Sequence, residues 1–494
     1  MTIFLLHYRI PVDRVQEENY REIHTKTRNG GGMRMARIQG DFTRGSVSGN
    51  ILRLGLPMML AELVHVLYNI VDRMYIGRMP ETGTIALTGL GVCFPLITLI
   101  GAFANLCSTG GATLATIARG KNRDDRAERI MGTSFTMLMI IGGTLTVLLF
   151  AAAPWALRLL GGDEETLPAA LSYFRIYVAG TIPVMISLGM NPFINAQGFP
   201  RTGMTTVIIG AALNIVLDPL LIYTFRMGIA GAALATVLSQ TASAAWVLFF
   251  LRSRKAPLKL RGLGIDRKEL GGIVKLGLTG FTFRITNSLT QAIVNITLKA
   301  WGGALSTLYI GAMSLINSIR EIVSLPNNGV VAGGQSVMSY NYGARQYGRV
   351  SECIRFIFVS GLAVNTAVWA LMMLAPQLLI SLFTDDGALI SRTVSCARIY
   401  FGAFPFMALQ LTGQSTFVSL NRPKHALVFS TLRKVVLVAP LTLLLPGLGL
   451  GADGVFWAEL ISQVTGASAC FITMVMLIWR KMKRPDGDLQ GDMV

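Results

Sequence analysis

The sequence predicts an all-α polytopic membrane protein. The chain has 494 residues, of which 52% are hydrophobic and only 14% are charged, whereas soluble proteins carry about 25% charged residues. The apolar residues come in blocks of about 20 residues or more, the length with which a helix crosses a bilayer. The net charge of +18 could suggest nucleic acid, but the charges gather in the short connections between apolar blocks. We therefore expect a lipid bilayer around the chain and no nucleic-acid partner.

Twelve apolar blocks are long enough to be membrane spans. We expect them at residues 51–76, 85–117, 131–154, 170–195, 203–224, 229–251, 272–298, 305–340, 354–376, 393–418, 426–446 and 453–479. The two longest blocks exceed the thickness of the hydrocarbon core, so each requires a tilt or a break.

Basic residues are concentrated in alternate connections, which fixes the expected orientation. Two connections on one side read "RGKNRDDRAER" (119–129) and "RSRKAPLKLRGLGIDRK" (252–268), whereas connections on the other side hold single residues such as Arg158 and Arg226. Cytoplasmic loops of membrane proteins carry the excess of Lys and Arg. We therefore expect a multi-pass protein of the cell membrane, in bacteria the inner membrane, with both termini in the cytoplasm.

The second half of the chain repeats the first at an offset of about 222 residues. "GIAGAALATVLSQ" (228–240) matches "GADGVFWAELISQ" (451–463), and "RIY" at 175–177 recurs at 398–400. Six spans per repeat make the halves parallel, which predicts two pseudo-symmetric six-helix lobes around a central cavity, the architecture of a transporter. The expected parts are a disordered cytoplasmic tail (1–43), an N-lobe (44–265), a C-lobe (266–484) and a second cytoplasmic tail (485–494).

A polar stripe runs along the first span. Glu62, His65, Asn69 and Asp72 are spaced by 3, 4 and 3 residues, which places them within an arc of about 80° on one helix face. Ionisable residues in hydrocarbon are costly and mostly face a cavity, where they mark an ion path. The stripe therefore predicts a wet interior surface.

Several segments resemble the multidrug and toxic compound extrusion (MATE) family. They are "LRLGLPMML" (52–60), "LYNIVDRMYIGR" (67–78), "QGFPRTGM" (197–204), "NIVLDPLLIY" (214–223) and "GIAGAALATVLSQ" (228–240). The resemblance covers about residues 45 to 480. It implies an antiporter that exports amphipathic, often cationic, drugs in exchange for inward H⁺ or Na⁺. We expect a monomer with no cofactor besides the coupling ion.

The resemblance also implies where the coupling ion binds. The chain is closer to the archaeal and DNA-damage-inducible-like branches, whose site lies in the N-lobe, and the matched residues here are Asp72, Asn214, Asp218 and Thr236. The branch with Vibrio-type pumps has an acid in the seventh span, and the aligned residue here is Asn287. We therefore expect no coupling acid at that C-lobe position.

The chemistry of the four residues suits either ion. A desolvated carboxyl group close to a second one can load a proton from one side of the membrane and release it to the other. Two carboxylates with an amide and a hydroxyl oxygen also form the hard-oxygen ligand set that a cation such as Na⁺ prefers. Asn214 and Asp218 are four residues apart and share a helix face, and Pro219 frees a backbone carbonyl nearby.

The repeat predicts that the two lobes differ. Glu62 aligns with Arg284, and Asp218 falls near Ala439, so the second lobe lacks the acids. We expect the N-lobe to couple the ion and the C-lobe mainly to line the drug cavity. The candidate cavity residues are Glu62, His65, Asn69, Asn191, Arg284 and Asn287.

Structural roles are the alternatives. Asp72 could pair with Arg73 or Arg78, Asp218 could cap a helix end, and Arg320 with Glu321 would form a buried ion pair rather than a site. An alternative transport function is a flippase for lipid-linked precursors, which would need a strongly cationic cavity. The chain has no HExxH motif, P-loop or Ser-His-Asp set, so we expect no enzyme.

Overall fold

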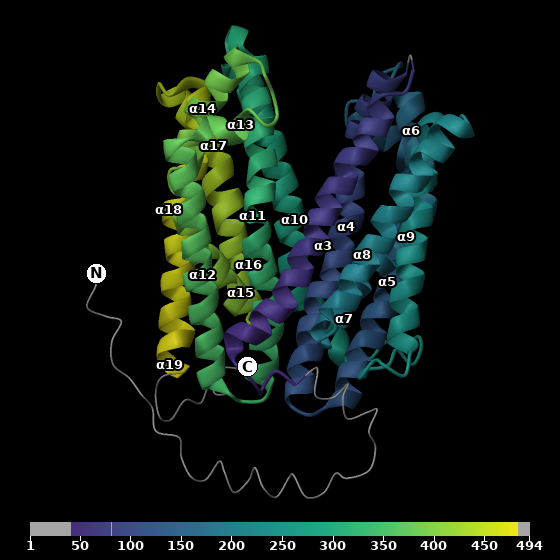
Figure 1. Ribbon diagram of the computed structural model, residues 1–494, viewed down its shortest axis with the longest axis vertical. Coiled ribbons are helices and arrows are strands. Elements are labelled where there is room, and N and C mark those ends of the chain that lie inside the picture. The colour runs from purple at the N-terminus through teal and green to yellow at the C-terminus, as the bar shows by residue number, and fades with distance from the viewer. Residues whose placement is uncertain (1–40, 81, 483–494) are drawn as a thin grey trace, which may run out of the picture.

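The computed structural model describes residues 41–80 and 82–482, and these residues form helices and no strands. The helices fall into two groups that correspond to the two halves of the chain (Figure 1). The N-lobe helices are α3 (Val47–Gly77), α4 (Gly83–Gly120), α5 (Asp124–Leu159), α6 (Leu167–Ala179), α7 (Thr181–Ala196), α8 (Pro200–Pro219) with a π-helical extension (Leu220–Thr224), and α9 (Gly228–Arg252).

The C-lobe begins after the connection at 253–266. Its helices are α10 (Arg267–Trp301), α11 (Ser306–Gly343), α12 (Tyr347–Leu374), α13 (Pro376–Ile380), α14 (Gly387–Phe401), α15 (Met407–Ser419), α16 (Pro423–Thr431) with a π-helical segment (Leu432–Val438), α17 (Ala439–Leu444), α18 (Gly454–Met474) with a second π-helical segment (Val475–Trp479), and α19 (Arg480–Met482).

The described helices account for the twelve predicted spans. Nine helices are long and apolar enough to cross a membrane, and two bent pairs raise the number to eleven. The twelfth span is α10, whose 35 residues include many threonines and amides that lower its hydropathy. The two longest predicted spans, α4 and α11, are continuous helices of 38 residues each, so neither is broken.

The bends lie at the same place in both repeats. The chain turns by 58° between α6 and α7 and by 43° between α14 and α15. The sequence there reads "RIYVAGTIP" (175–183) in the first lobe and "RIYFGAFP" (398–405) in the second. Pro183 and Pro405 lack a backbone N–H and disfavour a straight helix through the preceding turn. The repeat thus extends to the irregular features of the helices.

The lobes meet through small residues near one end of the molecule. A Cβ atom at Gly277 of α10 would collide with the carbonyl of Leu106 of α4, and one at Gly110 of α4 would collide with the carbonyl of Ile273. Helices of the two lobes converge at the end that carries α19 and separate toward the opposite end (Figure 1). Glycine allows this close approach of backbones, as in other membrane helix pairs.

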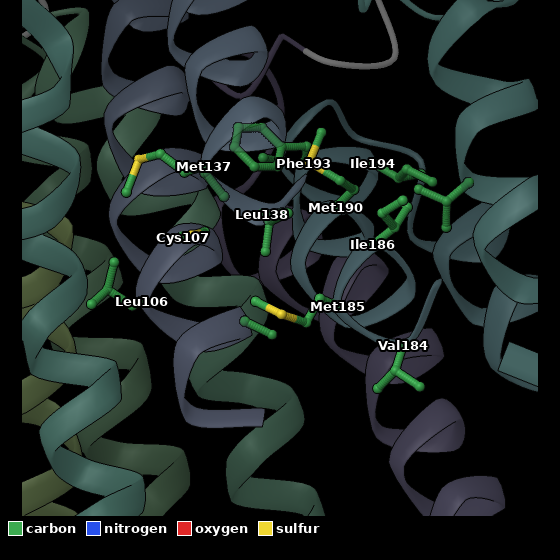
Figure 2. Close-up of a cluster of buried hydrophobic side chains, with 14 of the residues drawn as sticks. Leu106, Cys107, Met137, Leu138, Val184, Met185, Ile186, Met190, Phe193 and Ile194 are labelled. Carbon is green, nitrogen blue, oxygen red and sulfur yellow. The ribbon is translucent and has the colours of Figure 1, made fainter. Parts of the chain in front are cut away.

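The N-lobe has a dense apolar core. Leu106 and Cys107 of α4, Leu138 of α5, and Met185 and Phe193 of α7 are all buried and lie together in Figure 2. The same buried cluster continues into the C-lobe, where it includes Met338 and Phe417.

The predicted boundary of the N-terminal tail is wrong by three residues. Phe42 is only 3% exposed and packs edge-to-face on Tyr340, with ring centroids 5.4 Å apart. The guanidinium of Arg349 donates hydrogen bonds to the backbone carbonyls of Phe42 and Gly45, at 2.9 Å each. The segment from residue 41 therefore belongs to the folded protein. The rest of that tail (1–40) and the predicted C-terminal tail (485–494) lie outside the described residues.

Candidate functional site

Two carboxyl groups meet inside the N-lobe. Asp72 of α3 is 9% exposed and Asp218 of α8 is fully buried, and their side chains are in hydrogen-bond contact. Asp218 lies where α8 passes into the π-helical segment Leu220–Thr224, directly before Pro219. Single π-helical turns are frequent at functional sites because they redirect a side chain out of regular helical register. The local break positions Asp218 against Asp72.

Asn214 completes the contact from one turn earlier on α8. Its Nδ2 donates a hydrogen bond to Oδ1 of Asp218 at 3.2 Å, and the residue is 2% exposed. Three oxygens of this group are buried without a hydrogen-bond partner among the described residues: Oδ1 of Asp72, Oδ2 of Asp218 and Oδ1 of Asn214. Buried acceptors without partners are costly. The arrangement therefore suits a bound cation, which would be a proton or a metal ion of low charge.

Tyrosines surround the acid pair and connect it to Thr236. The Tyr173 phenol of α6 lies close enough to the Thr236 hydroxyl of α9 and to Asp72 to interact with both. Thr236 also donates to the carbonyl of Ala232 at 3.0 Å. Tyr68 of α3 lies close to both carboxyl groups. The structure thus brings together Asp72, Asn214 and Asp218 directly, and Thr236 through Tyr173.

The tyrosines were missed by sequence reasoning, although a signal existed for one of them. Tyr68 is four residues before Asp72 and so shares its helix face. Tyr173 lies on a different helix, and nothing in its sequence neighbourhood indicates that it reaches the site.

A small, mostly apolar pocket adjoins the acid pair within the N-lobe. It lies between α3, α7, α8 and α9, and the polar residues of its lining include His65, Tyr68, Asn214, Thr236 and Gln240. Asn214 and Thr236 belong to both the pocket and the predicted coupling site.

The polar stripe of α3 divides between two environments. Asp72 turns into the N-lobe, whereas Glu62 and His65 are exposed although both lie in mid-helix. Glu62 accepts a hydrogen bond from Nδ2 of Asn328 on α11 at 3.1 Å. It also interacts electrostatically with Arg284 on α10. Glu62 therefore lies in the space between the lobes.

The other predicted cavity residues, Asn69, Asn287 and Asn191, do not share one environment. Asn69 is bonded within α3, where its Nδ2 donates to the carbonyl of His65 at 2.7 Å. Asn287 is half-buried on α10, less than a turn beyond the exposed Arg284. Asn191 lies apart from the others, since its side chain donates to the carbonyl of Gly203 between α7 and α8 at 3.2 Å.

The ion pairs considered as structural alternatives do not form in the described part of the chain. Neither Asp72 nor Asp218 has a basic side chain within ion-pair distance. The predicted pair of Arg320 with Glu321 is wrong, because Nη1 of Arg320 instead bonds the hydroxyl of Tyr400 at 3.1 Å. Consecutive residues on a helix point about 100° apart, which explains why the two do not meet.

The family model described as MatE matches residues 57–220 and residues 285–444. The two matches fall one in each lobe. The chain belongs to the MatE family. The twelve-helix, two-lobe fold and the family together establish a multi-pass membrane protein.

Curated relatives at low identity extend over almost the whole chain. The multidrug export protein MepA of Staphylococcus saprophyticus is 24% identical over 440 residues, which cover 88% of this chain and 95% of the relative. The protein of the same name from Staphylococcus aureus strain NCTC 8325 is 22% identical over 446 residues, with the same coverage.

Solved structures share the fold of this MatE-family protein. One, described as the outward-facing conformation of a multidrug resistance MATE family transporter, has a TM-score of 0.83 at 23% identity and covers 93% of this chain and 100% of its own. A transporter of Pyrococcus furiosus, described as having a binding pocket of reverse polarity, has a TM-score of 0.82 at 22% identity, with 93% of this chain and 100% of its own covered.

Proposed function

We propose that this protein is a secondary antiporter that exports amphipathic organic cations in exchange for protons. The observation that carries the proposal is the buried contact between Asp72 and Asp218. Among the described residues no basic side chain lies within ion-pair distance of either carboxyl group, and Arg73 acts on Asp72 only from farther away. A pair of buried carboxyl groups needs a cation from solution to neutralise its charge. The names of the relatives as multidrug exporters support the substrate class.

The direct carboxyl contact favours a proton over Na⁺ as that cation. Two ionised carboxylates at hydrogen-bond distance repel each other strongly in a low-dielectric interior, whereas one proton shared between them turns the same contact into a hydrogen bond, as in acid pairs of enzymes. Sodium remains the alternative, because the unpaired oxygen of Asn214 and the Thr236 hydroxyl would add neutral ligands.

Loss of the proton creates the driving force for substrate binding. An unprotonated pair carries negative charge next to the pocket that His65, Tyr68 and Gln240 line, which attracts an organic cation. Substrate release on the far side lets the pair take up a proton again. A ligand that binds one state of the lobes better shifts their equilibrium toward that state, so proton and substrate each favour a different opening.

The sidedness of the cycle follows from the basic connections. The helix α19, which ends the described part of the chain, and the Lys/Arg-rich connection at 253–266 lie at the end where the lobes meet through glycines (Figure 1). The positive-inside rule assigns this closed end to the cytoplasm. The state described is then open to the outside, and the protein works as a monomer because one chain supplies both lobes.

The test is dye transport by the purified protein in liposomes. A pH gradient alone is expected to drive ethidium movement, a Na⁺ gradient alone is not, and Asp72→Asn with Asp218→Asn is expected to stop transport in the pH-driven arm. Transport driven only by a Na⁺ gradient would identify Na⁺, and not H⁺, as the coupling ion. Gradient-independent movement of ethidium, or unchanged pumping by the double variant, would reject the proposal.

The flippase alternative has less support. It needs a strongly cationic cavity, whereas the space between the lobes contains Glu62 opposite Arg284 and the N-lobe pocket adjoins two acids. Binding of a lipid pyrophosphate by the purified protein, together with no response to ethidium, would favour the flippase.

A further inference from the structure

A second buried charge cluster lies in the C-lobe. Lys434 is 5% exposed, and its Nζ is 3.3 Å from each carboxylate oxygen of Glu459. Nη1 of Arg433 is 3.2 Å from Oε1 of the same carboxylate, and both Arg433 and Glu459 are 6% exposed. All three side chains lie in the interior of membrane-spanning segments. The cluster plays no part in the function proposed above.

The cluster has more positive than negative groups. Arg320 of α11 lies within electrostatic reach of Glu459 and bonds the hydroxyl of Tyr400 on α14. The charged groups facing Lys434 are therefore Glu459 of α18, Arg433 of its own π-helical segment and Arg320 of α11. Glu459 is the one carboxylate within the cluster, and Glu321, an exposed residue of α11, acts on Arg320 from outside it. The excess of positive charge around Lys434 is unfavourable in a medium of low dielectric constant.

The repeat relates one member of this cluster to the N-lobe site. Glu459 aligns with Thr236 in the pair of segments 228–240 and 451–463, and Tyr400 aligns with Tyr177 in the "RIY" pair. Arg433 and Lys434 lie in the π-helical segment Leu432–Val438, which does not align with the segment Leu220–Thr224 beside Asp218. The second lobe therefore has a buried carboxylate where the first has a hydroxyl, and Lys434 aligns with the uncharged Ala211.

We propose that Lys434 is a second proton-exchange site, which gives up its proton in one state of the lobes and regains it in another. Lysine is the one cation of the cluster able to do so, because a guanidinium stays protonated in proteins. Deprotonation converts the Nζ ammonium to a neutral amine and passes H⁺ to water, and it leaves two arginines with one carboxylate. A proton also fits the tight burial of the cluster, which would exclude a larger ion.

The inference rests on the proposed antiport function and extends it to the C-lobe. If the acid pair alone exchanged protons, Lys434 would only need to be positive. If Lys434 exchanges one as well, a cation that cannot lose its proton must fail in its place. Arginine at position 434 keeps the charge and the hydrogen bonding to Glu459, so it separates these two roles.

The experiment compares Lys434→Arg with Lys299→Arg, a matched change at an exposed position of α10. Each variant is reconstituted in liposomes with a trapped pH-sensitive dye, and protons moved per ethidium are counted. Unfolding temperature in detergent shows whether each variant is folded. Lys434→Met, which carries no charge, serves as a second variant in case arginine does not fit.

Lys434→Arg is expected to fold and to lose roughly a hundredfold in transport rate, the size expected when a proton-transferring group is removed. Lys434→Met is expected to move fewer protons per ethidium than the natural protein. Lys299→Arg is expected to move as many as the natural protein. A normal rate and proton count in folded Lys434→Arg would overturn the inference. Failure of the natural protein to respond to any pH gradient would instead reject the antiport proposal.

Discussion

The acid pair of the N-lobe and the charge cluster of the C-lobe lie in the two halves of a duplicated fold. Among the described residues no basic side chain lies within ion-pair distance of Asp72 or Asp218, whereas Glu459 in the C-lobe pairs with Lys434 and Arg433. Duplication has preserved the helices and the bends, whereas the π-helical segments and the charges have diverged. The N-lobe site has an excess of carboxyl groups, and the C-lobe cluster has an excess of cations.

The difference shows two ways in which one fold accommodates buried charge. Burial makes any unpaired charge costly, so the charge is neutralised either by side chains of the same lobe or by a bound ligand. The acid pair of the N-lobe is of the second kind and so offers a site to a cation from solution. The comparison therefore predicts that variants of the acid pair abolish transport, and that variants outside the acid pair and the Lys434 cluster have smaller effects.

The largest effect is expected from Asp218→Asn. The amide keeps the shape and the hydrogen bond with Asn214 but cannot exchange a proton, so pH-driven ethidium transport should fall by about a hundredfold or to background. Cellular ethidium retention together with the amount of protein in the membrane measures it.

Glu164→Gln is the matched control, since Glu164 is an exposed acid in the connection between α5 and α6. Its transport should equal that of the natural protein. If Asp218→Asn pumped ethidium as fast as the natural protein at the same expression level, the N-lobe acids would be structural. The proposed difference between the two lobes would then be wrong.

An intermediate effect is expected at the contact between the lobes. In Gly277→Ala the new methyl group collides with the carbonyl of Leu106, and overpacking of this kind costs about 1–3 kcal/mol. The closed end should loosen, so the unfolding temperature in detergent and the transport rate should both fall.

Gly271→Ala, six residues earlier on α10, is the control because nothing lies within 4 Å of the Cβ position there. Equal unfolding temperatures for the two variants would show that the lobes do not meet closely at Gly277, and the comparison of two separately moving lobes would lose its structural basis.

The smallest effect is expected from Glu62→Gln. Glu62 is exposed between the lobes and bonded to Asn328, so removal of its charge should weaken the attraction of organic cations by about twofold to fivefold, as for a solvated ion pair of up to about 1 kcal/mol. The Michaelis constant for ethidium should rise and the maximal rate should stay. A loss as large as that of Asp218→Asn would move the coupling site to the space between the lobes.

The sequence was sufficient for the fold. Apolar blocks of membrane-spanning length and the repeat indicated twelve spans, and α10 was included correctly even though its threonines and amides make it less apolar than the others. Asp72 was grouped with Asn214 and Asp218 through the resemblance to the MATE family, because only Asn214 and Asp218 share a helix face.

The remaining features depend on tertiary contacts that no local pattern encodes. Tyr173 reaches Thr236 from a separate helix, and Asn191 turns to Gly203 instead of the cavity. Lys434 and Glu459 are 25 residues apart on different spans, and only the packing of α18 against the π-helical segment brings them together. The alignment of Glu459 with Thr236 was visible in the sequence, but its basic partners were not.

Infrared difference spectroscopy of the purified protein tests the acid pair most directly. Addition of ethidium should remove the carbonyl band of a protonated carboxylic acid in the natural protein, and the Asp72→Asn, Asp218→Asn double variant should show no such loss. Ethidium binding to the natural protein without any change in that band, or the same change in the double variant, would contradict proton exchange at Asp72 and Asp218.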